Sequence, residues 1–294
     1  MSARLIDGKA ISEQVLQETQ DGVTQFRAKH GCAPGLAFVR VGEDPASVVY
    51  VGAKAKMCER LGIQSQTFVL PAITSESQVL ELVRSLNGQK SIHGILVQAP
   101  LPDGMSQDRV FEAIDPAKDV DGFHPMNVGK LAVGDPGGFI ACTPAGVHQL
   151  LIRSGIEIAG KHVVVLGRSR IVGKPMALIL MEKGKYADAT VTVCHSRSRD
   201  LPSLTRQADI LIAALGRNRF VKADMVRDGA VVMDVGITRV PDSSKKSGFR
   251  LEGDVDFGSV SEKASWITPV PGGVGPMTIA MLMANTLKAA QFSM

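Results

Sequence analysis

A tyrosine and a lysine stand four residues apart in the first third of the chain, as Tyr50 and Lys54. On a helix this spacing places both side chains on one face, so that the ring and the amine point the same way. A lysine whose pKa is lowered by burial can act as an acid or a base. The alternative is an ordinary amphipathic helix surface, on which such pairs are common.

Two polar residues follow apolar segments later in the first half. Gln98 ends the apolar run 94–98 and precedes the proline-rich sequence 99–102, and Asp121 lies within Lys118-Asp-Val-Asp-Gly122. Loops that follow parallel strands are where open α/β sheets bind ligands. We expect Gln98 to orient a lysine or a water, and Asp121 to accept hydrogen bonds from an amino-substituted ring. Cap or turn residues are the equal alternative for both.

A glycine-containing loop joins an apolar strand to a helix in the second half, with the sequence Gly167-Arg-Ser-Arg-Ile-Val-Gly173-Lys-Pro. Gly167 permits a tight turn, Gly173 lets the helix start close to the strand, and exposed N–H groups at the helix N-terminus are expected to face a pyrophosphate. Ser169 stands where the usual GxGxxG pattern has its second glycine. The loop predicts a dinucleotide site, and the alternative is a plain strand-to-helix turn.

The end of the next strand indicates which dinucleotide is bound. An NAD enzyme usually places an acid there against the ribose hydroxyl, but this chain has Cys194-His-Ser-Arg197 and no carboxylate before Asp200. Arg168, Ser196 and Arg197 can donate to a 2′-phosphate, so NADP is the better electrostatic match. The alternative is that these are ordinary polar loop residues. For His195 we expect a structural or peripheral role.

A second glycine- and proline-rich segment, Thr268 to Thr278, precedes the last helix. Its glycines bring backbone close to a neighbour and its prolines fix the path of the chain. The neighbour is either a ligand or the first domain, to which the chain returns.

Short apolar runs alternate with helix-like segments along almost the whole chain, which predicts an α/β fold with parallel sheets in two domains. One helix is expected from an N-cap at Ser47 to Leu61, with Gly62 as its stop. Other helices are expected from Thr143-Pro144 to near Gly155, over 172–183 and over 278–292. Strands are expected over 36–41, 66–70, 94–98, 163–166, 190–194, 210–214 and 230–234.

The domain change is placed at the helix that opens with Thr143-Pro144. We expect residues 1–142 plus 275–294 to form an N-terminal catalytic domain, and 143–274 to form a Rossmann-type dinucleotide-binding domain. The C-terminal helix is expected to pack back on the first domain. The polar stretch 238–256, with Ser243-Ser-Lys-Lys-Ser247 at its centre, is expected to be a mobile excursion of the second domain.

Composition narrows the class of protein. The 294 residues are 45% hydrophobic and 21% charged, and the net charge of +4 comes from 33 basic and 29 acidic residues without long runs. This excludes a disordered chain and a nucleic-acid footprint. Four widely spaced cysteines without a CxxC pair, no membrane-spanning run and no export signal predict a cytoplasmic protein with reduced thiols. The six histidines are dispersed, so no metal site is expected.

Taken together, these motifs resemble one family, the bifunctional methylenetetrahydrofolate dehydrogenase/cyclohydrolases, in order from about Leu5 to Thr286. Departures from the family pattern are Ala99 and Arg197, which bear on cofactor preference. The resemblance rests on Tyr50-x-x-x-Lys54, Val97-Gln-x-Pro-Leu-Pro102, Lys118-Asp-Val-Asp-Gly122, Gly167-Arg-Ser-x-Ile-Val-Gly-x-Pro175 and Pro271-Gly-Gly-Val-Gly-Pro-Met-Thr278.

The resemblance implies roles for single residues. Lys54 would be the cyclohydrolase residue, Gln98 the partner that tunes its protonation, Tyr50 the ring that stacks on the folate, and Asp121 the anchor of the pterin. These four form the implied catalytic set. Folate contacts would also involve Pro271, Gly272, Gly273 and Thr278. The implied cofactor-binding residues are Gly167, Arg168, Ser169, Gly173, Ser196 and Ile237, with Arg168 and Ser196 on the 2′-phosphate and Ile237 near the nicotinamide.

The implied chemistry has two steps in one cleft between the domains. NADP first oxidises 5,10-methylene-tetrahydrofolate to the methenyl form by direct hydride transfer, and water then opens the ring to give 10-formyl-tetrahydrofolate. Tetrahydrofolate derivatives are the expected partners, and a homodimer is expected. Three rival functions are a dehydrogenase-only member of the family, another NADP dehydrogenase acting on shikimate or an amino acid, and a non-enzymatic NADP sensor.

Overall fold

The computed structural model describes residues 2–245 and 248–294. The chain divides into two compact units. Unit 1 comprises Met1–Ser12 and Thr143–Thr278, and unit 2 comprises Glu13–Cys142 and Ile279–Met294. Helices α1 (Gly8–His30) and α10 (Val274–Phe292) each contribute residues to both units.

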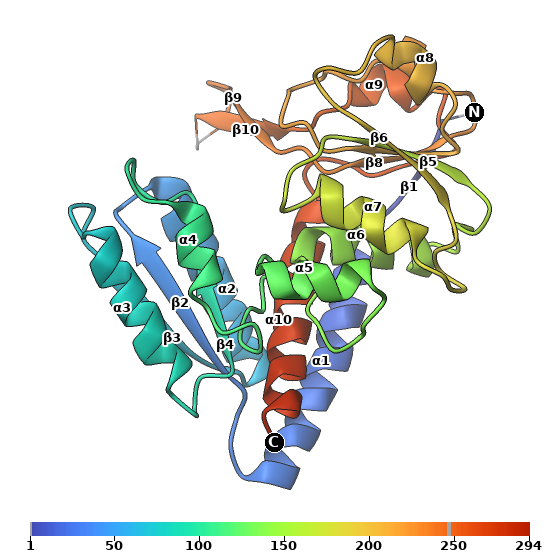
Figure 1. Cartoon of the computed structure of the whole chain (residues 1–294). Helices are drawn as coiled ribbons and strands as arrows, with labels where there is room; N and C mark the ends of the chain where they lie inside the picture. Colours follow the sequence, from blue (N-terminus) through green and yellow to red (C-terminus); the bar gives the residue numbers. More distant parts are fainter. Residues whose placement is uncertain (1, 246–247) are drawn as a thin grey trace. The chain divides into compact units, whose positions relative to one another are not determined.

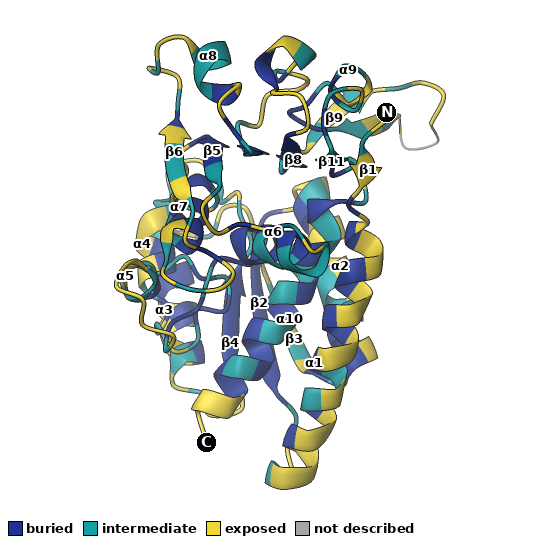
Figure 2. Ribbon diagram, turned by 90° about the vertical axis from the view of Figure 1, so that its right-hand side faces the viewer, coloured by how far each residue is buried: buried dark blue, intermediate teal, exposed yellow. Residues whose placement is uncertain are grey.

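Unit 2 is built on a parallel sheet of three strands in the order β3 (Gln64–Leu70), β2 (Gly35–Val41), β4 (Gly94–Val97). Every residue of β2 and β4 is buried, as their dark blue ribbons in Figure 2 show. Such continuous apolar strands are typical of a parallel sheet covered on both faces. Helices α3 (Glu76–Asn87) and α4 (Gln107–Glu112) bury their apolar residues against one face (Figure 1).

Helix α2 (Pro45–Leu61) packs on the same sheet and carries Tyr50 and Lys54. Its N-cap is Asp44, whose carboxylate accepts the Ser47 N–H at 2.7 Å, so the prediction of Ser47 as the cap is wrong by three residues. Asp44 is the N-cap because it is followed by proline at the first helical position, and because its carboxylate reaches an otherwise unpaired N–H. Gly62 ends the helix in the left-handed conformation, as predicted.

The C-terminal part of α10 belongs to unit 2, which confirms that the last helix packs on the first domain. Met283 Sδ lies 3.6 Å from Cys58 Sγ, and the Leu287 side chain occupies the space that a Cβ on Gly22 would need. The helix begins at Val274, four residues earlier than expected, so the end of the second glycine-rich segment is helical.

Unit 1 contains a six-stranded sheet in the order β1-β11-β8-β7-β5-β6, and every pairing in it is parallel. The four predicted strands are confirmed as β5 (His162–Leu166), β6 (Thr190–Cys194), β7 (Ile210–Ala213) and β8 (Val231–Asp234). Two further strands, β1 (Arg4–Leu5) and β11 (Trp266–Ile267), pair with each other at one side of the sheet. The α/β fold class is confirmed.

The division of the chain differs from the expected domains in two places. Residues 1–12 belong to unit 1, because Arg4 and Leu5 pair with Trp266 and Ile267 of the sheet. The first residues of α10, up to Thr278, also belong to unit 1.

Part of the polar stretch 238–256 is regular structure. Strands β9 (Thr238–Pro241) and β10 (Phe249–Glu252) form an antiparallel hairpin, in which Arg239 lies over the Phe249 ring. Lys246 and Ser247, at the centre of the predicted excursion, lie outside the described residues.

The remaining helices are short and connect the other elements. They are α5 (Pro125–Ala132), α6 (Cys142–Arg153), α7 (Gly173–Met181), α8 (Leu201–Thr205), α9 (Phe257–Val260) and the 3₁₀ turn η1 (Ala223–Met225).

None of the helices within residues 2–245 and 248–294 combines the length and apolar character needed to cross a membrane.

Candidate functional site

Lys54 and Gln98 are brought together in unit 2. The Lys54 Nζ donates to Gln98 Oε1 at 3.0 Å, across 44 positions of sequence. Gln98 follows the last residue of β4, and its Nε2 donates to the Ala99 carbonyl at 2.6 Å, which fixes the amide with its oxygen toward the lysine. Both side chains are half-buried, so the pair is reachable from solvent yet held in one geometry.

Tyr50 lies one helical turn before Lys54 on α2 and is 42% exposed. Its ring is therefore not part of the packed core of unit 2. A large exposed ring beside a lysine that is already hydrogen-bonded is available for stacking against a planar ligand.

Asp121 shares the electrostatic environment of Lys54. Burial raises the pKa of Asp121 to about 6, although the Lys54 charge opposes that rise, and Asp119 adds to it. A carboxyl group with a pKa of about 6 beside Lys54 is mostly ionised at neutral pH and retains acceptor capacity for a ligand.

The loop that carries Asp121 is fixed from two sides. The Asp119 carboxylate accepts the N–H groups of Phe123 and His124 and the Nδ2 of Asn127, at 2.8 to 3.2 Å. From α10, Asn285 Nδ2 donates to Val120 O at 2.9 Å and to Ile140 O at 3.1 Å.

Gly122 completes that arrangement, with φ of 77° and no room for a Cβ, which would lie 2.5 Å from Ala141 N. Sequence reasoning singled out Asp121 but missed Asp119, Asn127 and Asn285. The one feature of the sequence that could have indicated these three residues is that each is a polar side chain within a largely apolar segment.

The glycine loop of unit 1 runs from β5 to α7. A Cβ on Gly173 would lie 2.1 Å from Gly167 O, and one on Gly167 would lie 2.2 Å from Ala214 O, so both glycines are required by close backbone packing. Ser169 Oγ accepts the N–H groups of Val172 and Gly173, at 3.1 and 3.3 Å, and its carbonyl accepts that of Lys174. The expectation that these first helical amides are exposed is wrong, because Ser169 already occupies them.

The carboxyl ends of β5 and β6 lie side by side, with Leu166 paired to Cys194 and Gly167 N–H bonded to Cys194 O at 2.9 Å. The turn after β6 is closed by His195, whose Nδ1 accepts the Arg197 N–H, and the structure gives this histidine a structural contact. Exposed side chains at this edge are Arg168, Ser169, Ser196 and Arg197.

The nearest acid after β6 is Asp200, which caps α8 through the Ser203 N–H. Two guanidinium groups and a hydroxyl at neighbouring strand ends suit a doubly charged phosphate monoester, while no carboxylate of this turn is placed to bind a ribose hydroxyl. The residues present therefore fit the 2′-phosphate of NADP.

The second glycine-rich segment of unit 1 lies beside Ile237. A Cβ on Gly275 would lie 3.7 Å from Ile237 Cδ1, and Ile237 is 47% exposed. Thr278 Oγ1 lies 3.0 Å from Thr143 Oγ1. Gly273 packs against the start of α1, where its carbonyl oxygen lies 1.8 Å from the position of a Cβ on Gly8.

Comparison with known protein families decides the identity of the chain. Residues 6–121 match the family model described as tetrahydrofolate dehydrogenase/cyclohydrolase, catalytic domain, and residues 141–294 match its NAD(P)-binding domain. The chain belongs to the tetrahydrofolate dehydrogenase/cyclohydrolase family. This confirms the predicted family, its enzyme class and the presence of a nicotinamide-dinucleotide domain.

Relatives match this family member over nearly its whole length. A protein of Prosthecochloris aestuarii named bifunctional protein FolD is 56% identical over 286 residues, which cover 97% of each chain. The structure of the bifunctional FolD enzyme of Campylobacter jejuni is 47% identical with a TM-score of 0.93, covering 100% of both chains. That of Trypanosoma brucei, complexed with NADP cofactor and inhibitor, is 38% identical with a TM-score of 0.94, covering 100% of this chain and 99% of that one.

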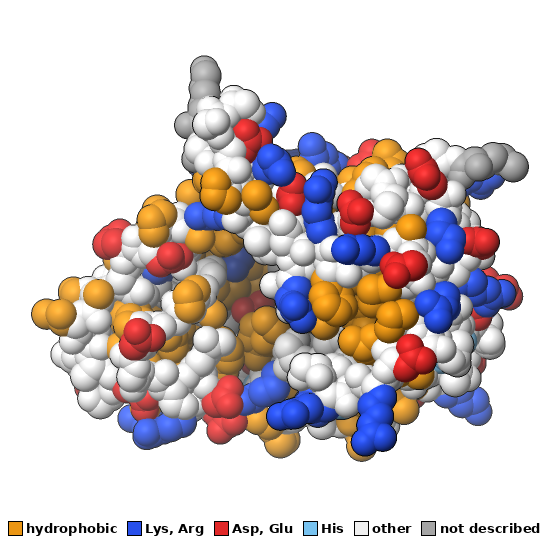
Figure 3. All heavy atoms as spheres, turned by 90° about the horizontal axis from the view of Figure 1, so that it is seen from above, with side chains coloured by type: hydrophobic (Ala, Val, Ile, Leu, Met, Phe, Trp, Pro, Cys, Tyr) orange, Lys and Arg blue, Asp and Glu red, His pale blue; other side chains and the backbone are white. Residues whose placement is uncertain are grey.

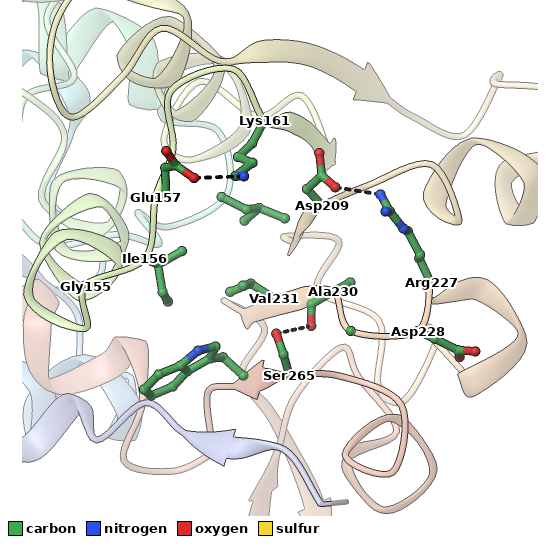
Figure 4. Close-up of a pocket in the computed structure, with 13 residues that line it drawn as sticks. Gly155, Ile156, Glu157, Lys161, Asp209, Arg227, Asp228, Ala230, Val231 and Ser265 are labelled. Carbon is green, nitrogen blue, oxygen red and sulfur yellow. Dashed lines mark hydrogen bonds and ion pairs between the residues drawn. The ribbon is translucent and has the colours of Figure 1, made fainter.

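A pocket of about 350 Å³ in unit 1 lies where β7 and β8 begin, at the amino ends of the strands of the six-stranded sheet. The glycine loop lies at the opposite, carboxyl ends. Figure 4 shows four of the pocket's charged side chains in two pairs, Lys161 with Glu157 at 2.9 Å and Arg227 with Asp209 at 2.6 Å. Because dinucleotides bind at the carboxyl ends of parallel strands, this pocket is not the cofactor site.

Charge on the surface of this family member is mixed. On the face shown in Figure 3, Lys and Arg side chains alternate with Asp and Glu and form no continuous basic tract. Within residues 2–245 and 248–294, no group of three or more His, Cys, Asp and Glu is arranged to hold a metal ion.

Proposed function

We propose that Lys54, held by Gln98, performs the proton transfers of the cyclohydrolase step in a bifunctional enzyme that oxidises 5,10-methylene-tetrahydrofolate and then hydrolyses the methenyl product. The observation that carries this proposal is the 3.0 Å hydrogen bond from Lys54 Nζ to Gln98 Oε1, with Asp121 in the same environment. Gln98 takes one N–H of the amine and so orients the rest of the group.

Ring opening needs three proton movements. A water oxygen bonds to the methenyl carbon and loses its first proton. The resulting hydroxyl then loses its second proton as the formyl C=O forms, and the bond from that carbon to N5 breaks as N5 gains a proton. The formyl group remains on N10, and the net reaction consumes one water and releases one proton. An amine that is neutral when water attacks can accept the first proton and return it to N5.

NADP is the cofactor of this enzyme and supplies the acceptor for the hydride of the first step. Gly167, Ser169 and Gly173 hold the backbone against the dinucleotide, and the exposed Arg168 and Ser196 bind its 2′-phosphate. Ile237 lies beside the nicotinamide, which agrees with its exposure and with its position directly after Gly236.

The folate is held by groups from two parts of the sequence. Asp121 accepts hydrogen bonds from the amino-substituted pterin, and the exposed Tyr50 ring stacks on the planar substrate. The backbone of Pro271, Gly272 and Gly273 and the Thr278 hydroxyl complete the folate contacts. We assign folate binding mainly to unit 2 and NADP binding to unit 1, whose bounds differ from the expected domains in residues 1–12 and in the first residues of α10.

The enzyme acts in folate one-carbon metabolism, where 10-formyl-tetrahydrofolate serves purine biosynthesis. We place it in the cytoplasm as a homodimer. The four cysteines among the described residues form no disulfide, which supports the cytoplasmic assignment because disulfides are rare in that compartment.

The experiment that tests the proposal replaces Lys54 with alanine and measures hydrolysis of 5,10-methenyl-tetrahydrofolate without any dinucleotide. General acid–base catalysis contributes about 10²–10⁴-fold, so the rate should fall by about 100-fold or more. NADP reduction should continue, with methenyl product accumulating. Lys56→Ala, an exposed lysine two positions along α2, is the matched control and should hydrolyse at the parent rate. Parent-like hydrolysis by Lys54→Ala would overturn the assignment.

A further inference from the structure

In open α/β sheets a dinucleotide binds in a crevice outside the carboxyl ends of the strands, and the loop after β7 lies at that end of this sheet. In unit 1 the chain passes from β5 to β6 on one side and then to β7 on the other side of β5. Ligands of open α/β sheets bind outside the carboxyl ends of the strands where the order reverses in this way. The loop also touches the glycine loop, since Ala214 O lies 2.2 Å from the position of a Cβ on Gly167.

A buried carboxylate holds this loop. Asp254 is 0% exposed, and its two oxygens accept the N–H groups of three consecutive residues, Leu215 at 2.5 Å, Gly216 at 2.9 Å and Arg217 at 2.7 Å. Three successive N–H groups that converge on one anion leave the backbone a single orientation, and charged acceptors make the stronger hydrogen bonds.

A second buried carboxylate holds the first. Asp234, the last residue of β8, accepts the backbone N–H of Asp254 at 2.9 Å and that of Gly236 at 3.0 Å. The space between the two is full, because a Cβ on Gly236 would lie 2.2 Å from Asp254 Oδ1, and one on Gly253 would lie 1.8 Å from Asp234 Oδ2. The segment that leads to Ile237 and the loop 215–217 are therefore fixed by one connected network.

The direction of the amides determines the direction of the carbonyls. In a trans peptide the N–H and the C=O of the same unit point oppositely. The Leu215 N–H points to Asp254, and the carbonyl of that peptide, Ala214 O, indeed lies against Gly167. Since the N–H groups of Gly216 and Arg217 also point to Asp254, the carbonyls of Leu215 and Gly216 point away from that carboxylate.

We propose that Asp254 is a positioning residue for NADP: it fixes loop 215–217 so that backbone carbonyls line the crevice and accept hydrogen bonds from ribose hydroxyl or nicotinamide amide groups. This inference rests on the proposed NADP function of unit 1. It concerns parts of the dinucleotide that NADP and NAD share, and it does not involve the 2′-phosphate.

The test is the Asp254→Asn variant, in which an amide of similar size replaces the carboxylate but one of its two ends can no longer accept. We expect the Kd of NADP, measured by calorimetry, to rise at least tenfold, and the Kd of NAD to rise by the same factor. Hydrolysis of methenyl-tetrahydrofolate without dinucleotide should stay within twofold of the parent. Asp228→Asn is the matched control, since Asp228 is 85% exposed at the opposite end of the sheet.

Three results overturn the inference: an unchanged NADP Kd in Asp254→Asn, loss of affinity for NADP but not NAD, or an equal loss of hydrolysis. A parent enzyme that binds no NADP would instead contradict the proposed function. If Asp254→Asn does not fold, hydrogen exchange of the backbone amides in the parent enzyme tests whether loop 215–217 is already fixed before NADP binds. Slow exchange of amides 215–217 without NADP supports a preset loop, whereas exchange that slows only on NADP binding overturns it.

Discussion

Asn285 of α10 donates to the carbonyl oxygen of Val120 at 2.9 Å, directly before Asp121 in the chain. Replacement by the apolar Asn285→Leu would leave Ile140 O without this donor, and Val120 O with only the Cys142 thiol at 3.3 Å. Because a buried unsatisfied polar group costs about 1–3 kcal/mol, we expect the free energy of unfolding to fall by about that amount, as measured by urea denaturation.

The same variant tests whether the α10 contact positions the folate. The KM for the folate should rise in both reactions, while the Kd of NADP stays at the parent value. A variant that loses stability but keeps both folate KM values would show that Asn285 serves the fold alone.

Binding of folate should depend on pH through Asp121, whose pKa burial raises to about 6. An ionised carboxylate accepts hydrogen bonds from the pterin better than the protonated acid, so the KM for methenyl-tetrahydrofolate should increase as the pH falls through 6. In Asp121→Asn the KM should be high and flat between pH 5 and 7.5. Asp103→Asn, at an exposed position near the Gln98 loop, should keep the parent profile.

Arg168 distinguishes the two dinucleotides if it binds the 2′-phosphate. In Arg168→Ala the Kd of NADP should rise about 10- to 100-fold, because a charge-assisted contact to phosphate is lost, while the Kd of NAD changes little. Arg227→Ala, at the opposite end of the sheet, is the control for loss of positive charge. Equal losses for both dinucleotides would remove Arg168 from the phosphate.

Asp234 should titrate near neutrality, because burial raises its pKa to about 7 although backbone N–H groups oppose the rise. The unfolded chain releases this proton near the ordinary value of 3.8, so the native state holds the extra proton between about pH 4 and 7. Its contribution to stability is therefore complete below pH 4 and is lost as the pH rises through 7.

Carboxyl ¹³C NMR measures that titration directly. Asp209 is an internal reference, because the His162 backbone N–H and the Arg227 charge lower its pKa. A midpoint for Asp234 below 5 would contradict the prediction.

Much of the fold followed from alternating apolar runs, because buried parallel strands and their helices leave a strong pattern. The edge strand β1 and its neighbour β11, each of two residues, leave no such pattern, and so the pairing of the first residues of the chain with this sheet was not predicted. The helix at Tyr50 and Lys54 was predicted, but not its cap at Asp44, because two suitable cap residues lie three positions apart.

The candidate site was predictable where the side chain itself is the proposed ligand contact. Lys54 and Gln98 belong to motifs, and their contact follows from the position of α2 on β4's sheet. Asp254 and Asn285 act on backbone groups of distant segments, and nothing in their local sequence indicates which N–H or C=O they reach. Only the folded arrangement reveals such residues.

Ser169 gives the glycine loop an internal substitute for an anion, since its hydroxyl accepts the Val172 and Gly173 amides. A phosphate that takes over these amides must first displace the serine, so its gain is only the difference between two sets of hydrogen bonds. Free inorganic phosphate has no other contact to offset that exchange, whereas a whole dinucleotide does. The loop therefore discriminates by ligand size, and millimolar cellular phosphate should be a poor competitor for the site.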